Sequence, residues 1–169
     1  MGTTISFKRP DGKDASGYLA RPGRADAPGI VVIQEWWGLQ DQIKGICDRF
    51  ALAGYEALAP DLYAGTVVPY HDADAANREM SSLNFLDATD QVVRGAAAFL
   101  KLTGVKVGLT GFCMGGAVTI LGAIRIPELS AASNPSTAAG VHQSSSLAKC
   151  PCSGTRMSPG LATFAGGSP

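Results

Sequence analysis

A cysteine set between two glycines is the residue of this chain best placed for nucleophilic chemistry. The stretch from Val105 to Gly116, VKVGLTGFCMGG, begins as an apolar run and then forms the pattern Gly-x-Cys-x-Gly around Cys113. This pattern is typical of a nucleophile elbow, a sharp strand-to-helix turn that usually carries serine. The flanking glycines allow a tight and strained backbone turn. We therefore expect the Cys113 thiol to project from the end of a strand.

The segment that follows Cys113 would assist a reaction at the thiol. Met114 begins a helical segment, and the free N–H groups and the dipole at a helix N-terminus favour both a thiolate and an oxyanion. A structural alternative is open at this point, because free cysteines often pack as small buried hydrophobic residues. The strand before Cys113 and the helix after it favour the nucleophile.

A carboxylate and two tryptophans follow another apolar stretch. Residues 29–34, GIVVIQ, are continuously apolar at their centre, which is typical of a strand covered on both faces in a parallel sheet. Glu35, Trp36, Trp37 and Gly38 come directly after this strand. Open α/β sheets bind their ligands at the carboxyl ends of strands. The sequence therefore places Glu35 and the tryptophans at a ligand-binding edge.

The remaining periodicity predicts the elements that hold these residues in place. Strand-like runs alternate with helical patterns, which indicates a doubly wound, mostly parallel α/β sheet. The predicted elements are a hairpin at 3–8 and 16–20, strands at 29–34 and 55–59, helices at 41–53 and 83–102, and the strand before Cys113. Cys47 lies on the apolar stripe of the first helix, so we interpret it as a packing residue.

The composition excludes several classes of function. The 169 residues suit a single domain, and a formal net charge of zero favours neither nucleic acid nor an anionic membrane as a partner. No apolar run reaches the roughly 18 residues of a membrane span, and the N-terminus lacks the plan of a signal peptide. We therefore expect a cytoplasmic protein whose four irregularly spaced cysteines are free thiols. Cys150 and Cys152 have one residue between them, which argues against a metal or redox pair.

The C-terminal segment differs in composition from the rest of the chain. All fourteen acidic residues lie at or before Glu128, whereas residues 129–169 contain none and are rich in Ser, Gly, Pro and Ala. Such a segment lacks the charged helix faces and long apolar runs that further strands and helices need. We therefore predict an α/β unit over residues 1–128 and a tail over residues 129–169 that is disordered or results from a shifted reading frame.

Three motifs occur in a characteristic order: VVIQEWWG at 31–38, LAPDLY at 58–63 and GLTGFCMGG at 108–116. Together they resemble the dienelactone hydrolase family, the carboxymethylenebutenolidases, which are cysteine members of the α/β-hydrolase fold. The resemblance covers about residues 5–128 and implies an α/β-hydrolase-like sheet whose C-terminal strands are missing. It also implies a hydrolase that needs no cofactor and no metal. The implied substrate is a small lactone or ester, since the family opens dienelactone to maleylacetate during aromatic compound degradation.

The resemblance also implies roles for individual residues. Cys113 would be the nucleophile, and Glu35 the carboxylate that faces the thiol and helps to generate the thiolate. The backbone N–H groups of Trp36 and Met114 would form the oxyanion hole. Arg78 resembles the arginine that binds the substrate carboxylate. A thiolate that attacks a carbonyl between two N–H donors is chemistry that these residue types support.

The chain departs from the family after Cys113. The catalytic triad of this fold runs nucleophile, acid, histidine, and the last two residues follow later strands. Glu128 is the only carboxylate after Cys113, and His142 is the only downstream histidine, without the glycine-histidine setting of the family. We therefore expect activity to be impaired by the loss of the triad aspartate and histidine.

Two alternatives to the hydrolase stay open. In one, the chain is a non-catalytic, truncated fragment that survives with a partner or as an aggregate. In the other, Cys113 opposite Glu35 is a redox-sensing or amidotransferase-like elbow cysteine, because a helix N-terminus and a nearby carboxylate also suit oxidation of a thiol. The motifs around Glu35 and at 58–63 favour the hydrolase.

Overall fold

The core of the protein is a six-stranded, mostly parallel sheet. The computed structural model describes residues 1–102 and 106–134, and within them the strand order is β1-β2-β4-β3-β5-β6. The strands β4, β3, β5 and β6 run parallel to one another, whereas β1 and β2 form an antiparallel hairpin that pairs with β4 through β2. The strands are β1 Thr3–Lys8, β2 Asp14–Ala20, β3 Gly29–Ile33, β4 Glu56–Pro60, β5 Val107–Gly111 and β6 Ala131–Ser133. The predicted α/β class and entry hairpin are confirmed.

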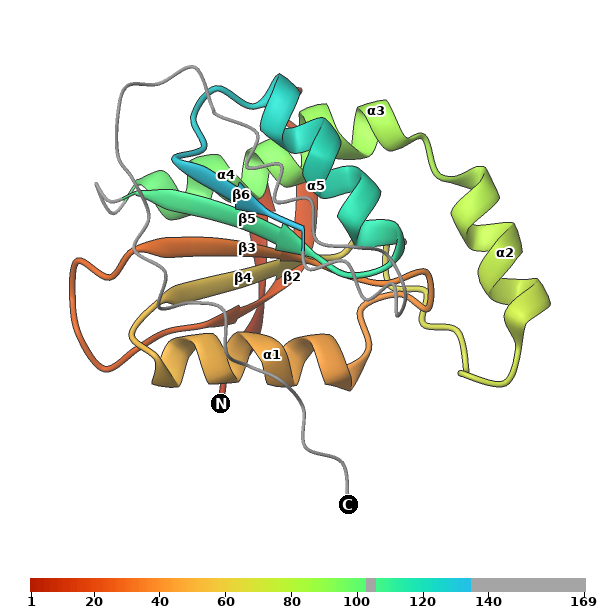
Figure 1. Ribbon diagram of the computed structural model, residues 1–169, viewed down its shortest axis with the longest axis horizontal. Helices are drawn as coiled ribbons and strands as arrows, with labels where there is room; N and C mark the ends of the chain where they lie inside the picture. Colours follow the sequence, from red (N-terminus) through yellow and green to blue (C-terminus); the bar gives the residue numbers. More distant parts are fainter. Residues whose placement is uncertain (103–105, 135–169) are drawn as a thin grey trace, which may run out of the picture.

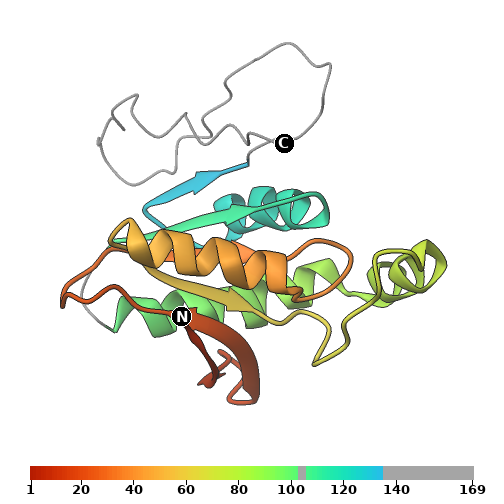
Figure 2. The ribbon, with the colours of Figure 1, turned by 90° about the horizontal axis from the view of Figure 1, so that it is seen from below.

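Helices cover both faces of this sheet. In Figure 1, α1 lies below the sheet, and α4 and α5 lie above it. Figure 2 shows the β1–β2 hairpin and β6 at opposite ends of the sheet. The helices are α1 Asp41–Leu52, α2 Ala73–Ser82, α3 Phe85–Asp87, the π-helix η1 Ala88–Val93, α4 Arg94–Lys101 and α5 Met114–Arg125. No helix in the described part of the chain is long and apolar enough to cross a bilayer.

Strand β3 separates two hydrophobic clusters, as its apolar run predicts. Val31 and Ile33 face the cluster beneath α4 and α5, whereas Val32 faces the cluster beneath α1. Successive side chains of a strand point to opposite faces, so a strand buried on both sides must be apolar throughout. Cys47 lies fully buried in the α1 cluster, and burial raises the pKa of its thiol to about 12. The prediction that Cys47 is a packing residue is confirmed.

The region from residue 83 to 102 differs from the single long helix that we expected there. Helix α2 precedes it and begins where the Asp72 carboxylate accepts a hydrogen bond from the N–H of Ala75, at 2.9 Å. The next helical segment begins after Asn84, whose side chain accepts bonds from two N–H groups of the first turn. It then passes through the π-helix η1 before α4. Short polar side chains cap the starts of these helical segments. Apolar periodicity alone does not predict such starts.

The folded part of the chain continues past Glu128, where we placed its end. Leu129 is 1% exposed, and the N–H of Ser130 donates to the carbonyl of Val107 at 2.8 Å. We expected no strand in this segment, yet β6 pairs in parallel with β5. Backbone pairing needs no long apolar run, and small residues such as Ala131 and Ala132 fit beside β5. The rest of the predicted tail, with His142, Cys150 and Cys152, lies outside the described residues.

Candidate active site

Cys113 occupies a strained turn between β5 and α5. Its backbone has φ 53° and ψ −118°, a conformation that residues with a side chain rarely adopt. Strand β5 ends at Gly111 and helix α5 begins at Met114, so Cys113 stands at the strand-to-helix junction. The Cys113 side chain is exposed, whereas the residues on either side of it are partly or fully buried. The structure therefore has the elbow geometry that Gly-x-Cys-x-Gly predicts.

The two glycines of this pattern are required by close backbone contacts. A Cβ atom on Gly111 would lie 2.2 Å from the carbonyl oxygen of Gly115. A Cβ atom on Gly115 would lie 2.6 Å from the carbonyl oxygen of Gln34, at the end of β3. Distances this short do not occur between a real Cβ and a backbone oxygen. Gly115 thus brings the first turn of α5 directly onto the end of the neighbouring strand.

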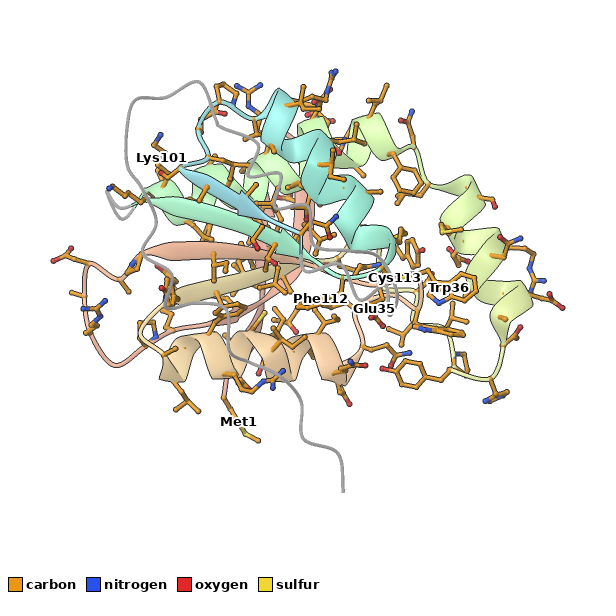
Figure 3. The ribbon with its side chains drawn as sticks, viewed as in Figure 1. Met1, Glu35, Trp36, Lys101, Phe112 and Cys113 are labelled. Atoms are coloured by element: carbon orange, nitrogen blue, oxygen red, sulfur yellow. The ribbon has the colours of Figure 1, made fainter. Side chains whose placement is uncertain are left out.

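Glu35 lies at the same edge of the sheet as Cys113. Strands β3 and β5 pair with Ile33 opposite Gly111, so Glu35 and Cys113 each follow that pair by two residues. Figure 3 shows Glu35, Trp36, Phe112 and Cys113 gathered where the two strands end. The Glu35 side chain is half-buried and has no hydrogen bond or ion pair within the described residues. Its carboxylate is therefore free to interact with the thiol or with a ligand.

Two backbone N–H groups beside Cys113 have no acceptor in the described part of the chain. In the first turn of α5, the N–H groups of Gly115 and Gly116 donate to the carbonyls of Phe112 and Cys113, at 2.8 and 2.9 Å. The N–H of Met114 makes no such bond, and neither does the N–H of Trp36 in the turn after β3. Backbone N–H groups without an acceptor are the kind of donor that can stabilise an oxyanion.

The tryptophans form part of an aromatic wall beside Glu35. The ring centroids of Trp36 and Trp37 are 4.8 Å apart, and those of Trp37 and Tyr70 are 5.5 Å apart, both in edge-to-face geometry. Burial and the negative charges of Glu35 and Asp41 raise the pKa of Tyr70. Trp36 also packs against the core beneath α4 and α5. The aromatic residues thus both support the turn and border the site.

Tyr63 belongs to the site, although its residue type gave no signal of this in the sequence. It follows the Pro60 end of β4 and is 7% exposed. Its hydroxyl lies 3.2 Å from the carbonyl oxygen of Trp36 and 3.2 Å from Sδ of Met114. Burial, together with the charges of Glu79 and Cys113, raises the pKa of Tyr63 to about 12. The only sequence signal was its membership of the LAPDLY motif, to which we assigned no role.

Arg78 lies on helix α2. It is exposed on α2, and its guanidinium has no ion pair or hydrogen bond in the described residues. Both views show α2 projecting beside the sheet rather than covering it. The neighbouring Glu79 is half-buried, and it is Glu79 whose charge reaches Tyr63. The structure therefore gathers Glu35, Trp36 and Cys113 at one edge of the sheet, beside the first turn of α5, and it leaves the role of Arg78 a prediction.

Comparisons with known proteins show which sequences this chain is similar to. Residues 15–146 match the profile of the dienelactone hydrolase family. The protein usf of Aquifex pyrophilus is 39% identical over 144 residues, which cover 80% of this chain and 61% of that protein. A protein of Aquifex aeolicus, provisionally named carboxymethylenebutenolidase, is 35% identical over the same shares of both chains.

A solved structure shows the same arrangement of elements. The crystal structure of a provisionally identified dienelactone hydrolase from Klebsiella pneumoniae is 32% identical and superposes with a TM-score of 0.66. The match covers 78% of this chain and 58% of that one. The chain therefore spans about three fifths of the length of these relatives.

Proposed function

The chain belongs to the dienelactone hydrolase family, and on that premise we propose that Cys113 is the nucleophile of a hydrolase for small lactones or esters. The observation that carries this proposal is the elbow itself. An exposed thiol stands on a left-handed, non-glycine residue at a strand-to-helix junction. Such strain persists only where the surrounding structure imposes it, and it is concentrated at functional sites.

The proposed first step is acylation of the thiol. Glu35 accepts the thiol proton, and the Cys113 thiolate adds to the carbonyl carbon of the substrate. The carbonyl oxygen then carries the negative charge, which the N–H groups of Trp36 and Met114 stabilise. A donor of this kind contributes roughly 3 to 4 kcal/mol to the transition state. When the ring C–O bond breaks, the leaving enolate recovers the proton from Glu35 and a thioester on Cys113 remains.

We propose that the second step, hydrolysis of the thioester, is slow in this chain. Water must be activated by a base, and general-base assistance typically contributes about 10² to 10⁴-fold in rate. Glu128 does not serve the thiol, because its Oε1 accepts hydrogen bonds from the Arg94 guanidinium at 2.6 and 3.1 Å. His142 lies outside the described residues. We therefore propose that Cys113 is acylated faster than the resulting thioester is hydrolysed.

For the substrate, we propose a small enol lactone or ester with a good leaving group, of the dienelactone type that the family opens to maleylacetate. The aromatic wall of Trp36, Trp37 and Tyr70 supports a flat, unsaturated molecule. Arg78 stays a proposed carboxylate binder, and it would have to act from the exposed surface of α2.

Intact-mass spectrometry after brief exposure to a small enol lactone or to 4-nitrophenyl acetate tests this function. We expect one acyl group per chain, mapped to Cys113 and absent from Cys113→Ala. Cys47→Ala is the matched control and should acylate normally, since the Cys47 thiol is buried. Acylation no faster than that of a free thiol would contradict the proposal. If mild peroxide instead converts Cys113 to a sulfinate without any acyl adduct, the redox alternative is favoured.

A further inference from the structure

Tyr63 links the two segments that hold the oxyanion-hole donors. One of these segments is the turn after β3, where Trp36 lies, and the other is the first turn of α5, which Met114 begins. The Tyr63 hydroxyl touches both, through the carbonyl oxygen of Trp36 and through Sδ of Met114. We propose that Tyr63 is a positioning residue that fixes the distance between the Trp36 and Met114 N–H groups. This inference rests on the proposed function.

The direction of the hydrogen bond follows from the donors and acceptors present. A tyrosine hydroxyl has a single proton, and a carbonyl oxygen accepts it far better than a thioether sulfur does. We therefore assign the bond to the carbonyl oxygen of Trp36, with Sδ of Met114 in contact on the other side. Within the described residues, no N–H group donates to this carbonyl in place of Tyr63. The hydrogen bond from the Tyr63 hydroxyl thus holds the turn at Trp36 in place.

The Tyr63 hydroxyl keeps its proton over the whole range in which a thiol reacts. Burial and the nearby negative charges of Glu79 and Cys113 raise its pKa to about 12. The Tyr63 hydroxyl would therefore stay protonated, and able to donate its hydrogen bond, when a thiolate forms at Cys113. A hydroxyl that keeps its proton can donate its hydrogen bond to the Trp36 carbonyl throughout the reaction.

The loop that carries Tyr63 is itself tied down. The Asp61 carboxylate accepts hydrogen bonds from the N–H of Tyr63 at 2.9 Å and from the N–H of Gly65 at 2.6 Å. The N–H of Leu62 donates to Oε1 of the fully buried Gln34 at 3.2 Å. Gln34 immediately precedes Glu35, so these hydrogen bonds connect the Tyr63 loop to the turn that carries Glu35 and Trp36. A rigid support of this kind is what places donors within a fraction of an ångström.

A comparison of two reactions at Cys113 separates positioning of the oxyanion hole from general damage. Acylation by 4-nitrophenyl acetate develops an oxyanion, whereas alkylation by iodoacetamide at a saturated carbon does not. Both reactions require the thiolate, so the ratio of their rates cancels any change in thiolate concentration. The ratio is measured on the full chain by peptide mapping at Cys113, with N-acetylcysteine as the reference thiol.

We expect Tyr63→Phe to lower the ratio of acylation to alkylation about tenfold, because donors displaced by a fraction of an ångström lose transition-state stabilisation. The matched control is Tyr18→Phe, which also removes a partly buried hydroxyl, one whose hydrogen bonds are with Gly2 and Asp48 and not with the turn at Trp36. Its ratio should equal that of the unchanged chain. Asp61→Asn, which loosens the loop and keeps the hydroxyl, should lower the ratio about threefold.

The outcomes distinguish this inference from the function on which it rests. If the unchanged chain exceeds the ratio of N-acetylcysteine but Tyr63→Phe and Asp61→Asn retain the full excess, the positioning role is wrong and the proposed function stands. If the unchanged chain shows no excess, Cys113 has no working oxyanion hole, and both the proposed function and the role of Tyr63 are overturned. Should Tyr63→Phe fail to fold, Asp61→Asn decides the question in the same way.

Discussion

The two strands beside β5 differ in the length of their pairing with β5 and in how deeply their side chains are buried. On one side, β3 pairs with β5 over five residues, from Gly29 to Ile33, and is covered by helices on both faces. On the other side, β6 pairs with β5 over three residues, and its side chains are partly or fully exposed. The β3 side carries Glu35, the tryptophans and Tyr63. The β6 side is where this fold places later strands and the remaining catalytic residues.

Helix α5 shows the same contrast around its axis. Val118 and Gly122 are fully buried against the sheet, whereas Ile120 is 53% exposed and Ile124 is 77% exposed. The exposed isoleucines are four residues apart and so lie on one face. The difference teaches that the proposed nucleophile and oxyanion donors are supported mainly from the β3 side, which is well packed within the described residues. The predictions below test whether substitutions on the β3 side have larger effects than substitutions on the β6 side.

The largest effect is expected where the elbow touches β3. In Gly115→Ala, the new Cβ would lie 2.6 Å from the carbonyl oxygen of Gln34 and 2.8 Å from that of Ile33, so the backbone must shift. We expect a loss of about 4 kcal/mol or more in the free energy of unfolding, measured by urea denaturation. The control is Gly45→Ala in α1, where a Cβ meets nothing within 4 Å. It should gain about 0.5 to 1 kcal/mol, and equal losses in both variants would refute the steric argument.

A smaller effect is expected on the β6 side. Leu129→Ala removes a side chain that is 1% exposed and packs in the cluster beneath α4 and α5. We expect the free energy of unfolding to fall by about 3 kcal/mol, as for other buried leucines. Ile124→Ala, at a position that is 77% exposed, should change it by less than about 0.5 kcal/mol. A Leu129→Ala variant as stable as Ile124→Ala would mean that the chain after Glu128 adds nothing to the fold.

The difference between the two sides also explains which parts of the fold the sequence predicts. Strand β3 is apolar at consecutive positions because both its faces are covered, so its pattern identifies it without a structure. Strand β6 consists of Ala131, Ala132 and Ser133, and nothing in their types distinguishes a strand from a loop. Its pairing comes from β5, more than twenty residues earlier in the chain. Local patterns report burial well and report backbone pairing with a distant strand poorly.

The candidate site divides in the same way. The elbow is local in sequence, since its two glycines lie two residues before and two residues after Cys113, and the sequence alone identifies it. Tyr63 is non-local, because its contacts reach back 27 residues to Trp36 and forward 51 residues to Met114. No spacing rule connects such residues. The exposure of Arg78 was also beyond the sequence, since an exposed and a half-buried arginine on α2 have the same local pattern.

The next prediction concerns chemistry on the β3 side. Glu35→Gln keeps the size of the side chain but cannot accept the thiol proton. We expect the rate of Cys113 acylation at pH 7 to fall about 10²-fold, the lower end of general-base effects, since a cysteine depends on a base less than a serine does. The loss corresponds to about 2.7 kcal/mol in the barrier. Glu79→Gln is the control for removing a negative charge near the site, and an equal loss there would assign the effect to charge alone.

The smallest effect is expected at the ion pair that ties the chain before β6 to α4. Burial alone would raise the pKa of Glu128, but the hydrogen bonds and charge of Arg94 outweigh it and lower that pKa. A carboxyl with a lowered pKa stabilises the fold above its ordinary pKa, and this stability is lost as the pH falls through the folded-state pKa.

For this partly exposed pair we expect Glu128→Gln to cost about 0.5 kcal/mol in the free energy of unfolding at pH 7. The difference should be smaller near pH 3, below the ordinary glutamate pKa of about 4.3, and should vanish only below the lowered folded-state pKa. Urea midpoints of both proteins at the two pH values measure it, and Asp14→Asn, whose partner Lys8 is exposed, serves as the reference. A difference that persists unchanged at pH 3 would show that Glu128 acts through packing. The segment before β6 would then be held to α4 by packing, with no contribution from the charge of Glu128.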